Sequence, residues 1–479
     1  MIHRQPRGVT LIEILIAAAI TLIAVAAAMG VLSVQNLNFS KSSGQGQAIA
    51  QSEMAFDALE RAVRMAGTGI DPQMAFDFDS YKCVLPGAAL TEMTESANCN
   101  AGVRDSVSAP DELIVTYRDP AYSVNATPGW TGCPATPNNG LIGRVWGVTA
   151  ASAATPSVTL AMKPGDTLFR GQVLQVVCDD ALTYVFVTAS SGRSTVASTA
   201  TACSSTTVNL YAAQTNDPYN RPSNLSAACF SNGNARAYAV RRQRFFIHRD
   251  LTQTIPHPYL MLDQGLDLND DTHLDDLDLL PVAADIEDLQ IAYALDQVGI
   301  MTLTTPPTGW IKTTYVTDSN ANGVWGDDPG NTTAEQLSYP LTAGNPATAQ
   351  FTAANSALGY GTGQKCTGSA GTSFYQYPCL LGTLPVEDST ANSIHAYRWT
   401  AWPGNIAGVQ VGLVARAPVQ QLTGATTEEQ TIPAVLNRPA QAGTYTTFYQ
   451  ALNPSGHKRV TVLTTVRPVN IALQSLFWN

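Results

Sequence analysis

The feature that most constrains this 479-residue chain is an apolar run near its N-terminus, which begins directly after an acid, Glu13. Between residues 14 and 34 only three side chains interrupt the run, namely Thr21, Gly30 and Ser33. In an α-helix this run spans roughly 30 Å, which is the thickness of the hydrocarbon core of a bilayer. The sequence therefore predicts a membrane-spanning helix.

The charges on either side of the run predict its orientation. Arg4 and Arg7 precede it and no cluster of basic residues follows closely. The N-terminus is therefore expected in the cytoplasm and the rest of the chain is expected to be exported. Two other classes of segment share this pattern: an ordinary secretory signal cut near the alanines at 26–28, and an uncleaved single-pass anchor.

Glu13 argues against an ordinary signal. A carboxylate in a lipid-embedded helix costs about 2.5 to 3.5 kcal/mol at the bilayer centre and less near the interface, so it requires a partner. If the chain is cut after Gly8, the new α-amine of Val9 lies one helical turn from Glu13. That amine would supply a positive charge to its own chain or to a neighbouring one.

Residues 7–13, RGVTLIE, together with the apolar run, resemble the class III signal of type IV prepilins and of type II secretion pseudopilins. That family has a basic leader ending in Gly, a hydrophobic first mature residue and Glu as the fifth. The resemblance implies that a prepilin peptidase cuts between Gly8 and Val9 and methylates the Val9 amine, and that Glu13 guides docking into a filament. Val9 stands where the family usually has Phe, and Gly30 stands where major pilins often have Pro.

A second helical pattern follows the apolar run. Gly67 and Gly69 supply its stop signal, and some loosening of the helix is expected around 43–46. Five residues recur at spacings typical of one apolar helical stripe: Ile49, Phe56, Leu59, Val63 and Ala66.

Beyond the helix the pattern changes to short β-rich runs between loops. Two stretches rich in Ser, Thr, Ala and Gly, about 120–235 and 297–400, are interpreted as insertions. Six runs are interpreted as strands: 111–118, 172–178, 237–247, 286–294, 406–415 and 459–469.

The pilin resemblance implies an α+β, type IV pilin-like fold. A long N-terminal hydrophobic α-helix would pack on an antiparallel β-sheet head with large disulfide-containing insertions. The expected divisions are a leader, a helix with transmembrane and amphipathic parts, and a β-rich periplasmic or extracellular head: 1–8, 9–66 (with 9–34 and 48–66) and 67–479.

The chain has eight cysteines, all beyond the apolar run and none in a C-x-x-C pair: Cys83, Cys99, Cys133, Cys178, Cys203, Cys229, Cys366 and Cys379. An even number in an exported chain favours disulfides formed in an oxidising compartment. Pairing of Cys83 with Cys99 and of Cys366 with Cys379 would close short loops. Free buried thiols are the alternative.

The order of the later strands resembles the PilW group of large minor pilins. The matching strings, in chain order, are Arg241-Arg242, a leucine-rich acidic loop, 286–290 (IEDLQ), 413–416 (LVAR) and 459–462 (RVTV). The resemblance implies a minor filament subunit.

Residues 318–328 resemble the front half of a calcium loop, because oxygen side chains alternate before a glycine that allows a sharp turn. Pro329 stands at the position of the closing Glu, so an aspartate would have to close a shorter loop. The candidate ligands are Asp318, Asn320, Asn322, Val324, Asp327 and Asp328. The alternative is an ordinary Asn/Asp/Gly-rich turn without an ion.

A weaker calcium candidate lies at 267–278, where Thr272 stands in place of the glycine. Here a solvated acidic loop is the favoured interpretation. The ligands of a calcium site would be Asp267, Asn269, Asp271, Asp275 and Asp278.

Nucleic-acid binding and catalysis find little support. The formal net charge is −11, and the one concentrated basic run, at 241–244 (RRQR), is expected to pair with the acidic loop. On a strand Arg242 and Arg244 share one face and Arg241 points to the other. No nucleophile elbow, phosphate loop or zinc-protease motif is found, so an enzyme is not expected.

These features predict a minor pilin of a type IV pilus, assembled through its N-terminal helix, in a tip-located or assembly-priming complex that supports pilus biogenesis, adhesion or motility. Its partners would be other minor pilins, the major pilin, the prepilin peptidase and a PilY-type tip adhesin. It would reside in the inner membrane before assembly and in the extracellular pilus afterwards. The alternatives are a minor pseudopilin of type II secretion and a calcium-dependent adhesin carried on a filament.

Overall fold

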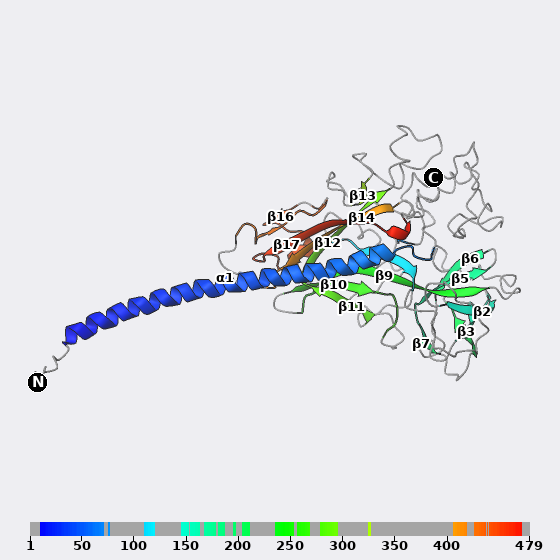
Figure 1. The fold of residues 1–479 in the computed structure, drawn as a ribbon, viewed down its shortest axis with the longest axis horizontal. Helices are drawn as coiled ribbons and strands as arrows, with labels where there is room; N and C mark the ends of the chain where they lie inside the picture. Colours follow the sequence, from blue (N-terminus) through cyan, green and yellow to red (C-terminus); the bar gives the residue numbers. More distant parts are fainter. Residues whose placement is uncertain are drawn as a thin grey trace, which may run out of the picture.

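The computed structural model consists of one long helix and a β-rich body (Figure 1). It describes residues 10–70, 75–76, 110–119, 145–152, 154–162, 167–178, 181–186, 195–197, 204–210, 235–252, 256–268, 278–295, 324–326, 406–418, 426–436, 438 and 440–471.

Helix α1 (Leu11–Met65) is 55 residues long and runs without a break through the glycines at 44 and 46. It begins at an N-cap, Thr10, and ends at Ala66, after which Gly67 adopts a φ of 77°. A positive φ is favourable for glycine, which explains why the helix stops here. The loosening expected around 43–46 is therefore wrong: Gly44 is buried against the body, and that packing holds the segment helical.

The larger sheet has nine strands in the described part of the chain, and every pairing in it is antiparallel. Its longest strand, β9, pairs with β1, β2, β5 and β10 along its length. The strands are β1 (Leu113–Arg118), β2 (Val145–Ser152), β3 (Ser157–Met162), β5 (Val173–Cys178), β6 (Ala181–Phe186), β8 (Ser204–Asn209), β9 (Arg236–Asp250), β10 (His257–Asp263) and β11 (Leu280–Ala284).

A second antiparallel sheet has the strand order β13-β12-β14-β17. Its strands are β12 (Ile286–Leu295), β13 (Val324–Gly326), β14 (Ile406–Arg416) and β17 (Arg459–Val466). Two small two-stranded pairings and a short helix complete the described elements: β4 (Thr167–Phe169) with β7 (Thr195–Ala197), β15 (Thr431–Ile432) with β16 (Gln441–Ala442), and α5 (Thr447–Gln450).

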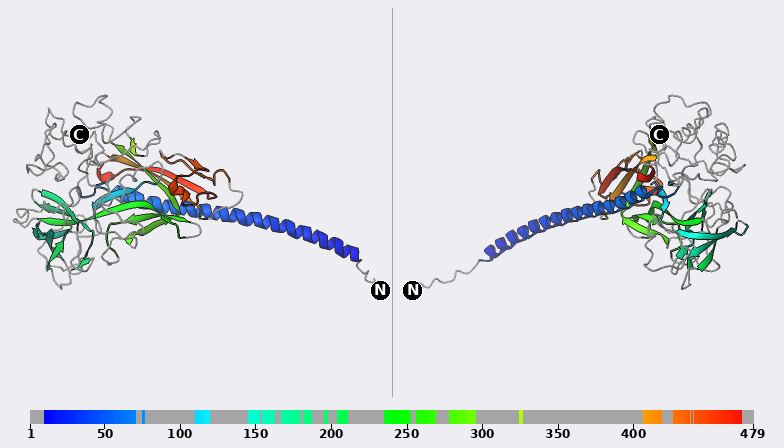
Figure 2. Two further views of the ribbon diagram at one scale, coloured as in Figure 1. Left: turned by 180° about the vertical axis from the view of Figure 1, so that it is seen from behind. Right: turned by 45° about the vertical axis from the view of Figure 1, so that its right-hand side comes forward.

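The first half of α1 extends away from the body, whereas its second half packs on it (Figures 1 and 2). The main hydrophobic core joins that second half to both large sheets through residues such as Leu59, Phe245 and Leu413. A separate core gathers around Trp146 and Leu160, on β2 and β3.

The architecture confirms the α+β, pilin-like fold class with its long apolar helix and antiparallel body. Each of the six strands predicted from sequence has a counterpart: β1, β5, β9, β12, β14 and β17. The proposed divisions of the chain stay predictions, and most of the second insertion, 297–400, lies outside the described residues.

Candidate functional site

The N-terminal half of α1 is fully exposed in the isolated chain. Every residue from 10 to 39 is exposed, including large apolar side chains such as Leu11 (77% exposed) and Phe39 (76%). The helix is long and apolar enough to cross a membrane. An apolar surface of this extent requires lipid or other apolar helices as its environment.

Glu13 is the only charged residue between positions 10 and 40, and Thr10 holds its carboxylate. The backbone N–H of Thr10 donates to Glu13 Oε2 over 2.8 Å and the Thr10 hydroxyl donates to the same oxygen over 2.9 Å. In return the Glu13 N–H donates to Thr10 Oγ1 over 3.4 Å. This reciprocal capping box places the negative charge at the positive end of the helix dipole.

The capping box was missed from sequence, although its signal was present. A Thr followed three residues later by Glu, directly before an apolar run, is a standard helix start. The only partner expected for Glu13 was the Val9 amine, and Gly8 and Val9 both lie outside the described residues. Glu13 Oε2 accepts both bonds from Thr10, and Oε1 accepts none among the described residues.

The second half of α1 is held on the body by small side chains. The predicted stripe is confirmed at Leu59, Val63 and Ala66, which are buried, but it is wrong at Ile49, which is 41% exposed. The surface that contacts the body over the preceding turns is formed by Gly44, Ala48, Ser52 and Ala55. Small residues allow close approach of a helix to a sheet, and a pattern based on large apolar residues overlooks them.

One ion pair fastens the helix where it first reaches the body. Lys41 Nζ lies 3.2 Å from Glu429 Oε1, and the Glu429 side chain is 2% exposed. The backbone N–H of Thr426 also donates to the Glu429 carboxylate over 2.8 Å. Burial alone would raise the pKa of Glu429, but the Thr426 hydrogen bonds and the Lys41 charge hold it below its ordinary value.

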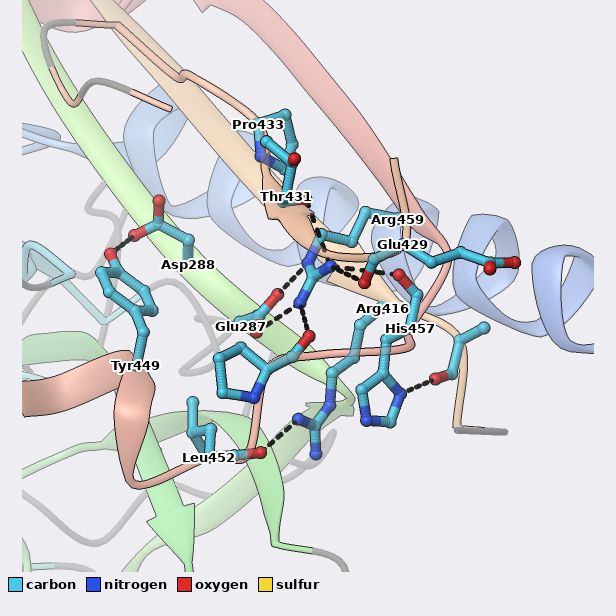
Figure 3. Close-up of polar contacts among 12 residues, drawn as sticks. Glu287, Asp288, Arg416, Glu429, Thr431, Pro433, Tyr449, Leu452, His457 and Arg459 are labelled. Carbon is cyan, nitrogen blue, oxygen red and sulfur yellow. Dashed lines mark hydrogen bonds and ion pairs between the residues drawn. The ribbon is translucent and has the colours of Figure 1, made fainter. Parts of the chain in front are cut away.

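A buried cluster of charges lies next to Glu429, on and around strands β12, β14 and β17 of the four-stranded sheet (Figure 3). Arg459 binds Glu287 with two hydrogen bonds, 2.7 Å from Nε to Oε2 and 3.2 Å from Nη2 to Oε1. Asp288 pairs with Arg438 and accepts a hydrogen bond of 2.7 Å from the Tyr449 hydroxyl. Glu287, Asp288 and Arg438 are 0% exposed, so the cluster is shielded from solvent.

Strand register brings these residues together. In β12 and β14 Ile286 pairs with Ala415, and in β14 and β17 Arg416 pairs with Arg459. The three strings IEDLQ, LVAR and RVTV, which carried the resemblance to the PilW group, are therefore neighbours in one sheet. Arg416 Nη1 donates to the Leu452 carbonyl over 2.9 Å, and its Nε lies 3.7 Å from Asp285.

The pKa shifts in this cluster follow from burial and charge. Burial alone would raise the pKa of Glu287, but the charges of Arg459 and Arg416 hold it below its usual value. Burial, and then the positive charge of Arg416, lower the pKa of His457 to about 4. His457 is therefore neutral at pH 7, and its Nδ1 lies 2.8 Å from the Ala417 carbonyl oxygen.

Comparison with known proteins assigns the N-terminus. Residues 3–29 match the family model described as the prokaryotic N-terminal methylation motif. The chain is a type IV prepilin-like protein. The matched segment contains the predicted cleavage position, Glu13 and most of the apolar run. No curated protein and no solved structure matches the chain.

In this prepilin-like protein the basic run on β9 has structural partners. Arg242 and Arg244 are 4% and 3% exposed, and the Arg241 side chain is 37% exposed, which confirms the predicted division between two faces. For Arg241 and Arg244 the closest acidic partners lie outside the acidic loop, whereas the expected pairing stays a prediction for Arg242. Arg244 binds Glu112 and Arg241 binds Asp119, because the pairing of β9 with β1 places those two acids beside it.

The calcium candidates stay predictions. Val324 begins β13, with only its backbone described, and the other proposed ligands at 318–328 lie outside the described residues: Asp318, Asn320, Asn322, Asp327 and Asp328. In the second loop Asp267 and Asp278 are buried, and Asp278 Oδ1 accepts a hydrogen bond of 2.6 Å from the Leu268 N–H. Asn269, Asp271 and Asp275 are outside the described residues. Where side chains are described, no group of three His, Cys, Asp or Glu residues forms a metal site.

The predicted disulfides are likewise untested in the prepilin-like chain. Cys178 is the last residue of β5, where only its backbone is described. The remaining seven cysteines lie outside the described residues: Cys83, Cys99, Cys133, Cys203, Cys229, Cys366 and Cys379.

Proposed function

We propose that this protein is a minor pilin of a type IV pilus, of the PilW group, that joins the filament through α1. The observation that carries the proposal is the methylation motif on a helix whose first half is entirely exposed while its second half is fixed to a large β-rich head. Such a helix supplies an apolar surface for contact with the helices of other subunits. The head would supply the surface that binds particular partner proteins.

Glu13 has the central role in the proposed assembly step. Thr10 occupies one carboxylate oxygen, so Glu13 Oε1 remains for the N-terminal amine of a neighbouring processed subunit. Cleavage between Gly8 and Val9 by a prepilin peptidase would create that amine on each subunit. The pairing would neutralise an acid that is costly in an apolar environment, and it would set the axial position of each incoming helix.

The size of the head supports a place at the filament tip or in a complex that primes assembly. A chain of 479 residues would crowd a helical lattice in which every subunit has identical neighbours. Proposed partners are other minor pilins, the major pilin and a PilY-type tip adhesin. In this proposal the chain is a structural protein rather than an enzyme, held in the inner membrane before assembly and in the extracellular pilus afterwards.

A type II secretion pseudopilin carries the same methylation motif, so it is the alternative outcome of the tests. The resemblance of the buried sheet strings to the PilW group favours the pilus. Presence of the protein in surface filaments would support the pilus, and its confinement to a secretion complex in the cell envelope would contradict it.

The first experiment is mass spectrometry of the mature N-terminus. We expect a polypeptide that begins at methylated Val9. A chain that still begins at Met1, or one cut beyond Ala28, would contradict the proposal.

The second experiment replaces Glu13 by Ala and follows the protein into sheared surface filaments. We expect normal membrane insertion and a strong loss of incorporation, because the neighbouring amine loses its partner. Glu53→Ala is the matched control, since Glu53 is an exposed acid on the same helix beyond the apolar run. Equal incorporation of both variants would contradict the role of Glu13.

A further inference from the structure

A cleft in the head is lined by residues between 119 and 268, which are separate from the residues of α1 used in the proposed assembly step. It has a volume of about 120 Å³ and is formed where three parts of the chain meet β9: the end of β1, the turn between β4 and β5, and the segment 264–268. Its lining includes Asp119, Phe169, Gln172 and Arg241.

The turn between β4 and β5 is built to hold its side chains in place. The Gln172 N–H donates to the Phe169 carbonyl over 3.0 Å, and Gly171 adopts a φ of 84°. This combination is a type II turn, which requires a positive φ at its third residue. The Asp267 N–H then donates to the Arg170 carbonyl over 3.1 Å and ties the opposite wall to the turn.

Gln172 provides an amide oxygen at the wall of the cleft. The residue is 8% exposed, and its Nε2 group donates to the carbonyl oxygens of Val240 over 2.8 Å and of Val173 over 3.2 Å. Its Oε1 atom has no hydrogen-bond donor among the described residues. An accessible amide oxygen in this position can accept a hydrogen bond from a hydroxyl group in the cleft.

The accessible charges at the cleft balance each other. Arg241 Nε lies 3.0 Å from Asp119 Oδ1, with the Arg241 side chain 37% exposed and that of Asp119 8% exposed. Arg242 also lines the cleft, but it is 4% exposed and bonded within the protein. An ion of either sign would meet repulsion from one member of the pair, whereas hydroxyl groups accept from the guanidinium and donate to the carboxylate.

The remaining walls suit a small ring with apolar C–H edges. Phe169 offers an aromatic ring, whose negative face attracts C–H groups, and Val173 and Val240 close the base at 4% and 1% exposure. The volume is well below the roughly 300 to 1,000 Å³ of drug-sized sites, so the cleft admits one ring with part of it in solvent.

We propose that this cleft binds the terminal sugar of a neutral glycan, with Arg241 and Asp119 bonding its hydroxyl groups and Gln172 Oε1 accepting from one of them. Glycan recognition goes beyond a role in filament assembly, and it does not depend on how α1 is used.

The test is saturation-transfer NMR on the full chain in detergent. The probes are the methyl glycosides of glucose, galactose, mannose and N-acetylglucosamine, with methyl glucuronide and methyl glucosaminide as charged comparators. We expect at least one neutral glycoside to bind with a Kd on the order of 1 mM, in the range of a single small ring.

Arg241→Gln and Gln172→Met should each weaken that binding about tenfold, which corresponds to the loss of one or two hydrogen bonds. Arg61→Gln is the matched control, because the Arg61 side chain is 77% exposed on α1 and should leave binding unchanged. Thermal midpoints of the variants would separate misfolding from loss of the site.

Three results would overturn the proposal. The first is absence of signal from every neutral glycoside with the unaltered protein, a measurement that needs no variant. The second is stronger binding of either charged comparator than of the neutral probes. The third is full binding in folded Arg241→Gln, or binding of free hexoses without binding of their glycosides.

Discussion

The two halves of α1 belong to one continuous helix, but the first half is exposed and the second half is packed against the body. From Leu11 to Phe39 every residue of the helix is exposed, including many large apolar side chains. From Ser40 to Met65 it contacts the body through Gly44, Ala48 and other small residues. The difference shows that one continuous helix can leave an apolar surface exposed along its first half while its second half is already packed against the head.

The largest expected effect comes from the buried cluster beneath the packed half. Glu287→Gln removes the carboxylate that Arg459 binds and leaves a buried cation, so it should lower the free energy of unfolding of the head by about 3 to 5 kcal/mol. Urea denaturation of the wild-type protein and the variant measures this difference in the free energy of unfolding. Membrane insertion through the exposed first half of α1 should be unchanged.

Glu60→Gln is the control for that loss. Glu60 pairs with Arg64 on the exposed side of α1, and such i,i+4 pairs contribute only about 0.3 to 0.5 kcal/mol. Replacing both Glu287 and Arg459 by Leu should recover much of the stability, because no unpaired charge remains. Equal effects of Glu287→Gln and Glu60→Gln would show that the cluster does not stabilise the head.

The packed region should also be sensitive to mild acid. The pKa of His457 is about 4 in the folded protein and near 6.5 when the side chain is free. As the pH falls from 6.5 to 4 the unfolded chain takes up a proton that the folded chain excludes, so stability falls by about 3 kcal/mol in total. By pH 5 the loss should be about 2 kcal/mol.

Denaturation between pH 7 and pH 5 isolates this effect. Glu287 has its pKa below the ordinary value, so its contribution is retained above pH 4.5 and is lost only in stronger acid. His457→Gln should flatten the pH dependence in this window. An unchanged slope in that variant would assign the acid sensitivity to other groups.

The contrast between the halves can be tested with one pair of substitutions. Ala55→Leu adds volume at a position that is 0% exposed and should destabilise the head by about 1 to 3 kcal/mol through overpacking. Ala27→Leu adds the same volume to the exposed half and should leave head stability unchanged. Thermal unfolding of both variants measures the difference, and equal midpoints would mean that the helix does not pack as described.

The smallest effect is expected at the boundary between the halves. Lys41→Gln removes the ion pair with Glu429, and we expect a loss of about 1 kcal/mol, because the hydrogen bond from the Thr426 N–H still holds the carboxylate. Global stability should fall only by this amount, and amide hydrogen exchange around Ser43–Gly46 should become faster. Unchanged exchange there would mean that the packing of Gly44 and Ala48 is sufficient to keep the backbone hydrogen bonds of this segment formed.

Local signals in the sequence were sufficient for α1, for six of the strands and for the N-terminal motif. The alternation in residues 459–469 predicted β17, and the glycines at 67 and 69 predicted the end of α1. The small-residue surface at Gly44 and Ala48 was missed, because the hydrophobic pattern gives weight to large side chains such as Ile49. The partnership of Asp288 with Arg438 was also beyond local reasoning, since 150 positions separate the two residues.

The sequence by itself determined the apolar helix, its acid at position 13, its N-terminal methylation motif and the positions of six strands. These follow from periodicity and from neighbours a few residues apart, which act before any tertiary contact forms. Tertiary structure alone decided that α1 is buried at Gly44 and Ala48, which acids pair with Arg241 and Arg244, and how Arg459 reaches Glu287. Those outcomes depend on strand register, because pairing across a sheet joins residues whose separation along the chain carries no local signal.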